Sequence, residues 1–112
     1  MKHAPMGEFT REEIASQPEV WRKTLDDLRG LDLQRLPPRS EYDQVIFTGC
    51  GSTYYLSIWA ARLCQSLCDR PVRALPASEL MIAPDTWVRP FRRTLLVTIS
   101  RSGGTTETVR VM

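Results

Sequence analysis

Two short apolar runs constrain the fold of this chain more than any other feature of its sequence. One occupies residues 44–48 (QVIFT) and is closed by Gly49, and the other occupies residues 94–99 (TLLVTI) and is closed by Ser100. Because neither run alternates apolar with polar residues, each predicts a strand that is buried on both faces. Such strands occur in parallel sheets with helices on both sides, so the sequence predicts an α/β fold.

The segment between the two runs supplies a helix and a further strand. Apolar residues recur at helical spacing over residues 53–67, and a short strand is predicted at residues 72–75. A brief helix capped by Ser78 and interrupted at Pro84 follows, and another helix is expected to start within residues 105–108. This alternation predicts parallel strands in the order 2-1-3 within a three-layer α/β/α arrangement. Because doubly wound sheets commonly have about five strands, the sheet is expected to be truncated after its third strand.

The N-terminal part of the chain is predicted to be helical. Thr10 and Glu13 have the spacing of a capping box, which predicts a short helix that ends just before Pro18. Pro18 is favourable at the first position of a second helix, which is expected to stop at Gly30. The predicted layout is a helical lead-in and linker at residues 1–43 and a domain at residues 44–112.

Charge and hydropathy exclude several classes of protein. Fifteen basic and thirteen acidic residues give a net charge of +2, and the lack of long like-charge runs argues against a nucleic-acid or membrane partner. No apolar run approaches the roughly 20 residues of a membrane helix, and residues 1–7 lack the apolar core of a secretory signal. A cytoplasmic location is therefore expected.

The sequence predicts neither a metal site nor a cofactor. Its three cysteines have none of the paired spacings of a disulfide framework, and Cys64 and Cys68 are expected to pack as small apolar residues. Cys50 is interpreted as a small residue beside a ligand, and His3, the single histidine, is given no role.

Two loops rich in glycine, serine and threonine stand at equivalent places in the predicted fold. One comprises residues 49–53 (GCGST) after the first strand, and the other comprises residues 100–107 (SRSGGTTE) after the third. Small residues let the backbone approach an anion, helix-start N–H groups point at it, and hydroxyl groups add donors. In a sheet of order 2-1-3, the two loops meet at the crevice where the winding reverses. The sequence therefore predicts a phosphate-binding site shared by both loops.

Two other interpretations of these loops stay open. Each loop alone is compatible with an ordinary strand-to-helix turn that uses glycine for geometry and a hydroxyl group for capping. Gly49 and Gly51 also supply the first two glycines of a dinucleotide-binding fingerprint, which would make this a Rossmann-type nucleotide domain. That fingerprint is incomplete, because Tyr54 occupies the third glycine position and no acidic residue directly follows the second strand.

The two loops resemble those of the sugar isomerase (SIS) domain family, in which paired Ser/Thr loops hold the phosphate of a phosphosugar. The resemblance is carried by residues 48–53 (TGCGST) and 100–105 (SRSGGT), and it extends upstream to residues 13–18 (EIASQP) with Trp21. That upstream segment is similar to the helical lead-in of tandem SIS proteins. These include the isomerase half of glutamine–fructose-6-phosphate aminotransferases and stand-alone amino-sugar-phosphate isomerases/deaminases. The resemblance implies a flavodoxin-like SIS sheet.

Position by position, the resemblance implies that both loops bind phosphate oxygens. Arg101 stands where the aminotransferase pattern often has glutamine, and Gly104 stands where it commonly has glutamate. The phosphate-binding residues implied by the resemblance are Gly51, Ser52, Thr53, Ser100, Arg101, Ser102, Gly103 and Thr105.

The resemblance also implies an activity. Moving a proton between C1 and C2 of a phosphosugar needs a general base, which in the family lies downstream of these loops, so this segment is expected to bind ligand without turning it over. Residue 2 is Lys rather than the nucleophilic cysteine of a glutaminase domain, which favours a stand-alone tandem SIS protein. A non-catalytic phosphosugar sensor is the alternative. A homo-oligomer is expected in either case, since an unpaired sheet edge seeks a partner strand.

Overall fold

The computed structural model describes residues 7–112, so the interpretation of His3 lies outside the described residues. The described chain forms two compact units that divide between Leu36 and Pro37, each with its own internal contacts. Within residues 7–112, no helix has both the length and the apolar character needed to cross a membrane.

The first unit contains one long helix, α1 (Glu8–Arg29), followed by the short 3-10 helix η1 (Leu33–Arg35). The predicted break before Pro18 is wrong, because α1 runs through this proline. A proline inside a helix removes one backbone hydrogen bond and strains the preceding turn. The glutamate, alanine and glutamine residues before it are good helix formers, so the missing hydrogen bond does not end the helix.

Glycine residues flank α1 at both ends. Gly7, with φ of 86°, precedes the helix without a side-chain cap, and Thr10 lies inside the helix, so the predicted capping box is wrong. Glu8 in the first turn complements the positive end of the helix dipole instead. The predicted stop at Gly30 is confirmed, and its N–H group donates to the carbonyl oxygen of Asp27 at 3.2 Å.

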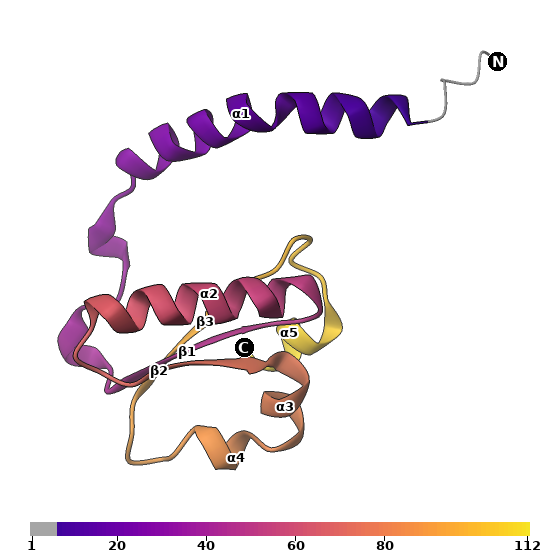
Figure 1. Cartoon of the computed structure of the whole chain (residues 1–112). Helices are drawn as coiled ribbons and strands as arrows, with labels where there is room; N and C mark the ends of the chain where they lie inside the picture. Colours follow the sequence, from indigo (N-terminus) through magenta and orange to yellow (C-terminus); the bar gives the residue numbers. More distant parts are fainter. Residues whose placement is uncertain (1–6) are drawn as a thin grey trace. The chain divides into compact units, whose positions relative to one another are not determined.

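The second unit is a parallel three-stranded sheet with helices on both faces (Figure 1). Its elements in chain order are η2 (Arg39–Glu41), β1 (Gln44–Gly49), α2 (Ser52–Leu67), β2 (Val72–Pro76), α3 (Ala77–Ile82), α4 (Pro84–Trp87), β3 (Thr94–Thr98) and α5 (Thr106–Arg110). The strand order β2-β1-β3 confirms the predicted order, and Val45 of β1 lies opposite Val72 of β2 and Leu95 of β3.

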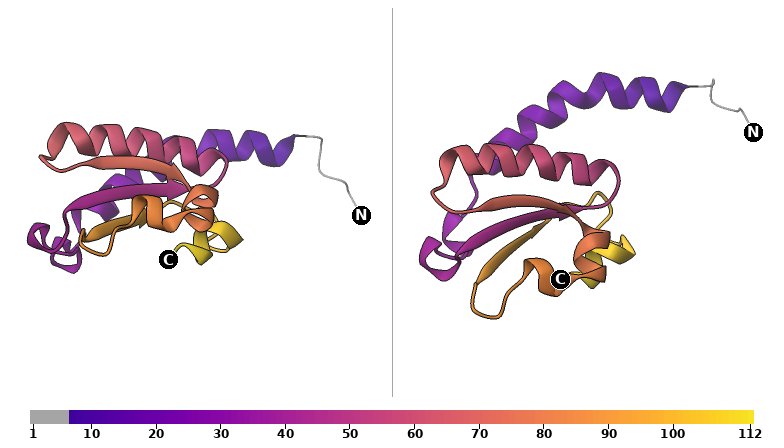
Figure 2. Two further views of the ribbon diagram at one scale, coloured as in Figure 1. Left: turned by 90° about the horizontal axis from the view of Figure 1, so that it is seen from below. Right: turned by 60° about the horizontal axis from the view of Figure 1, so that its bottom comes forward.

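The helices form two layers around the sheet, which confirms the predicted α/β class. Helix α2 covers one face, whereas α3, α4 and α5 lie on the other (Figures 1 and 2). The main hydrophobic cluster joins the sheet to this second layer. It consists of Ile46, Leu75 and Leu80, with Trp87, Leu96 and Val111 packed against it.

Helix α2 approaches the sheet through small side chains. Ser57 and Ala61 are its buried residues, whereas Leu56, Leu63 and Leu67 are more than half exposed. The periodicity of the sequence therefore predicts the helix correctly but does not reveal which side faces the sheet. Because small side chains let a helix and a sheet approach closely, α2 can cover β1 and β2 without a large apolar contact.

Strand β1 buries two polar side chains whose hydrogen bonds are satisfied. Gln44 Nε2 donates to the carbonyl oxygen of Trp87 at 3.0 Å and to Thr94 Oγ1 at 2.7 Å. Thr48 Oγ1 donates to the carbonyl oxygen of Leu75 at 2.8 Å. Because a buried polar group without a hydrogen-bond partner raises the free energy of the folded state, these bonds favour the observed position of β1 between β2 and β3.

An ion pair holds together the starts of β1 and β3. The Asp43 carboxylate accepts hydrogen bonds from the Arg93 guanidinium, with Oδ1 to Nη2 at 3.2 Å, and from the Arg93 backbone N–H at 2.9 Å. In return, the Asp43 N–H donates to the carbonyl oxygen of Arg93 at 2.8 Å. The side-chain hydrogen bonds, followed by the backbone one, hold the pKa of Asp43 below its ordinary value.

This ion pair predicts a specific acid sensitivity. A carboxyl group whose pKa is lowered by folding stabilises the fold above its unfolded pKa of about 4 and loses that contribution as the pH falls through the folded pKa. We expect Asp43→Asn to lower Tm at pH 7, and we expect the difference from wild type to shrink progressively as the pH falls below about 4. Thermal unfolding followed by circular dichroism across this range measures the effect.

Asp85→Asn is the matched control, because it removes the same charge from an exposed position of the same unit for which the described residues show no ion pair. An Asp43→Asn variant that loses no more stability than Asp85→Asn at pH 7 would contradict the prediction.

Candidate functional site

The two glycine-rich loops lie at the same edge of the sheet, as the sequence predicts. The first loop joins the carboxyl end of β1 to α2, and the second joins the carboxyl end of β3 to α5. Because β1 and β3 are parallel neighbours, their carboxyl ends share one edge. The loop that follows β3 lies beside the start of α2 in two different views (Figure 1 and the right panel of Figure 2).

The first loop is closed by a threonine that bonds to its own turn. Thr53 Oγ1 accepts a hydrogen bond from the Cys50 N–H at 2.9 Å and donates one to the Cys50 carbonyl oxygen at 2.8 Å. Gly51 precedes α2 with φ of 55°, a left-handed conformation that favours glycine. The Thr53 hydroxyl group is therefore engaged inside the loop, a role that the sequence pattern alone does not reveal.

Gly49 lets the first loop turn tightly against α2. A Cβ atom at this position would lie 2.6 Å from Thr53 Oγ1, 2.7 Å from the Thr53 carbonyl carbon and 2.8 Å from its oxygen. Two of these atoms belong to the helix backbone, which cannot move aside without shifting α2. Glycine at position 49 is thus required by the close approach of strand end and helix start.

The second loop is shaped by two serine hydroxyl groups. Ser100 Oγ accepts a hydrogen bond from the Gly103 N–H at 2.9 Å, and Ser102 Oγ accepts one from the Gly104 N–H at 3.2 Å. Gly103 adopts φ of 71°, which glycine tolerates without strain. Each serine still has its hydroxyl proton, so each can donate a hydrogen bond to an anion at the loop surface.

The remaining predicted site residues are accessible. Ser52 and Arg101 are exposed, and Thr105, at the start of α5, is half-buried. The two loops together offer hydroxyl groups, backbone N–H groups and one guanidinium, which is a set that suits a phosphate. These groups can bind and orient an anion, but none of them is a general base at neutral pH. The carboxylate of the second loop, Glu107, lies in the first turn of α5, where it complements the helix dipole.

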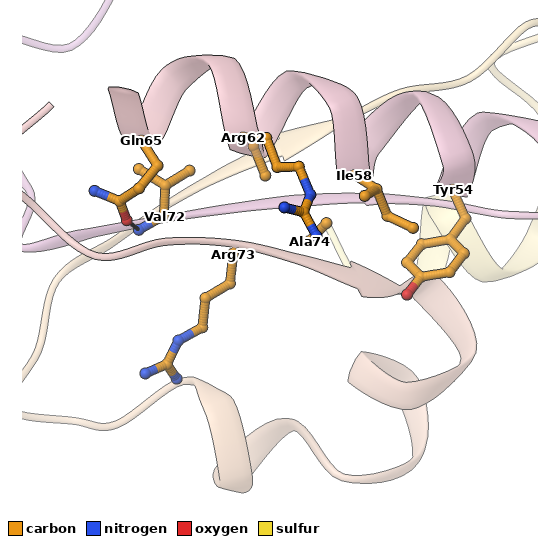
Figure 3. A pocket seen from close by; sticks show the side chains of 8 residues that line it. Tyr54, Ile58, Arg62, Gln65, Val72, Arg73 and Ala74 are labelled. Carbon is orange, nitrogen blue, oxygen red and sulfur yellow. Dashed lines mark hydrogen bonds between the residues drawn. The ribbon is translucent and has the colours of Figure 1, made fainter. Parts of the chain in front are cut away.

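A separate groove of about 370 Å³ lies between α2 and β2. Tyr54 and Arg62 of α2 line it, together with Val72 and Ala74 of β2 (Figure 3). Tyr54 occupies the position where a dinucleotide-binding fingerprint has its third glycine. Its side chain is half-buried and lines this groove.

The curated proteins that this chain resembles are named as enzymes of sugar phosphates. The chain is 32% identical over 111 residues to the D-galactosamine-6-phosphate deaminase AgaS of Escherichia coli, a match that covers 95% of this chain and 29% of that protein. It is 28% identical over 113 residues to the glutamine–fructose-6-phosphate aminotransferase (isomerizing) of Bordetella pertussis, with 96% of this chain and 18% of the relative covered. No family model matches the chain.

A solved structure supports the same assignment. The chain matches the crystal structure of tagatose-6-phosphate ketose/aldose isomerase from Escherichia coli with a TM-score of 0.78 and 28% identity, over 94% of this chain. These matches support assignment of the chain to the sugar isomerase (SIS) domain family. This SIS segment spans 30% of that isomerase chain and less than a third of the deaminase. The resemblance found in its two loops is thereby confirmed at the level of the family.

The close approach at Gly49 can be tested by a single added methyl group. We expect Gly49→Ala to cost about 1–3 kcal/mol of unfolding free energy, the usual cost of overpacking, because the new Cβ meets the α2 backbone. Urea unfolding at fixed temperature measures the change in midpoint.

Gly104→Ala is the matched control in the other loop, since the nearest atom to its added Cβ, Ser102 Oγ, is 4.0 Å away. Equal midpoints for the two variants would show that the loop around Gly49 has more room than the structure describes.

Proposed function

We propose that the two loops of this SIS segment bind the phosphate group of a phosphosugar. The observation that carries the proposal is the position of both loops at one edge of the sheet, after two adjacent parallel strands. Gly51, Ser52, Thr53, Ser100, Arg101, Ser102, Gly103 and Thr105 are the proposed phosphate-binding residues. A phosphate there would accept hydrogen bonds from neutral donors, and Arg101 would supply one positive charge.

The proposal extends to the class of protein that contains the segment. The relatives named above are a sugar-phosphate deaminase, aminotransferase and isomerase, so we infer that the segment serves an enzyme that converts a phosphosugar. Since none of the proposed phosphate-binding residues is a general base, the proton-transfer step would fall to other groups. Assembly as a homo-oligomer, the lack of a nucleic-acid or membrane partner, and a cytoplasmic location stay predictions.

The ligand class can be tested by thermal unfolding of the chain with separate ligands. A ligand present at about 100 times its dissociation constant stabilises a protein by about 2.7 kcal/mol. We expect fructose 6-phosphate, tagatose 6-phosphate or galactosamine 6-phosphate to raise Tm, with inorganic phosphate giving a smaller shift. A response to NAD but to no phosphosugar would favour the Rossmann-type alternative and overturn the proposal.

The location of the site is tested by removing two hydroxyl groups. We expect the double variant Ser100→Ala/Ser102→Ala to weaken phosphosugar affinity roughly 5-fold to 140-fold, because each neutral hydrogen bond contributes about 0.5–1.5 kcal/mol. Isothermal titration calorimetry with the ligand that gives the largest thermal shift measures the change.

Ser66→Ala is the matched control, because it removes a hydroxyl group that donates to the Leu63 carbonyl oxygen near the other end of α2. Unligated Tm values separate loss of binding from loss of folding, since both serines also accept loop N–H bonds. If the double variant folds and binds as tightly as Ser66→Ala, the second loop is not part of the site.

A further inference from the structure

Two cysteines meet at the end of α2 that lies away from the loops. Cys64 is in the last full turn of the helix, and Cys68 follows its final residue. Their Sγ atoms are 3.6 Å apart and both residues are half-buried. The prediction that both cysteines act as packing residues accounts for their partial burial, but it does not account for the contact between the two sulfurs.

The backbone at Cys68 allows the sulfurs to come closer. Residues four apart in a regular helix have Cβ atoms about 5–6 Å apart, whereas a disulfide needs roughly 3.5–4.5 Å. Cys68 has left the helix and is extended, with φ of −120° and ψ of 145°. Because Cys68 lies outside the helix, its backbone can adjust without unwinding α2.

The two cysteines have different surroundings. The Arg39 guanidinium hydrogen-bonds the Asp69 carboxylate, which follows Cys68 in the chain. The pKa of Arg39 is raised chiefly by that hydrogen bond and by the negative charge of the Asp69 carboxylate. In contrast, burial raises the pKa of the Cys64 thiol. Because the thiolate is the attacking species, Cys64 is suited to the second step of an oxidation rather than the first.

A metal site does not explain the pair. Structural zinc takes four ligands, and residues 7–112 contain no cluster of three or more histidine, cysteine, aspartate or glutamate side chains arranged to hold a metal ion. The contact is between two sulfurs only, which is the arrangement of a dithiol that can be oxidised.

We propose that Cys64 and Cys68 form a redox-active pair that is converted reversibly to an intramolecular disulfide by a peroxide. The Cys68 thiolate attacks one peroxide oxygen, so that an S–O bond forms and the O–O bond breaks. The hydroxide that leaves combines with the proton lost by the thiol to give water. Cys64 then attacks the sulfur of the resulting sulfenic acid. The S–S bond forms, the S–O bond breaks, and hydroxide leaves as a second water with the Cys64 proton.

Oxidation of the full chain with hydrogen peroxide tests this proposal. We expect a product lighter by two hydrogen atoms, with the mass change in the tryptic peptide of residues 63–73, and with one of the three thiols still open to alkylation. Dithiothreitol should restore all three. A product that gains oxygen atoms on one cysteine without losing two hydrogens, or that forms disulfide-linked dimers, would overturn the proposal.

Variants with one thiol removed assign the roles. Cys50→Ser is the matched control and should oxidise like wild type, because it leaves the pair intact. Cys64→Ser should accumulate a sulfenic acid that dimedone traps at Cys68, whereas Cys68→Ser should show at least tenfold less dimedone adduct. Cys64→Ala and Cys68→Ala repeat the test if a serine variant unfolds by circular dichroism. Equal trapping in the two variants would contradict the assigned roles.

Discussion

The pairing of β1 with a parallel strand on each side is the constraint on which the rest of this structure depends. Because β1 is central, its backbone groups are paired with β2 and β3, and its side chains are covered by helices on both faces. The same pairing brings the carboxyl ends of β1 and β3 together. The two loops that follow these ends are neighbours for this reason, although about 50 residues of sequence separate them.

Much of this arrangement could be predicted from the sequence because its strongest signals are local. Burial on both faces requires the unbroken apolar runs at β1 and β3. The backbone conformation at helix ends favours the glycines that close α1 and open α2. The strand positions, their order and the second half of α1 follow from them. The family could be recognised from loop residues alone, because close backbone approach and hydroxyl donors restrict which amino acids can stand there.

The features that escaped prediction depend on contacts between distant or competing groups. Pro18 lies within a helix because its neighbours favour the helical state strongly enough to tolerate one lost hydrogen bond. The hydrogen bonds of Thr53 Oγ1 with the Cys50 backbone close the first loop, and loop composition does not reveal them. Likewise, the spacing of Leu56 and Leu63 indicates a helix but not which side a sheet will cover. Only the three-dimensional packing distinguishes these outcomes.

The turn after the cysteine pair is secured by one amide side chain. Gln65 Nε2 donates to the carbonyl oxygens of Cys68 and Arg70, and its Oε1 accepts the backbone N–H of Val72. That N–H sits on β2, an outer strand, and Pro76 at the other end of β2 has no N–H to offer. The rim of the sheet is thereby poorly suited to recruiting a foreign strand, which protects the molecule against edge-to-edge aggregation on this side.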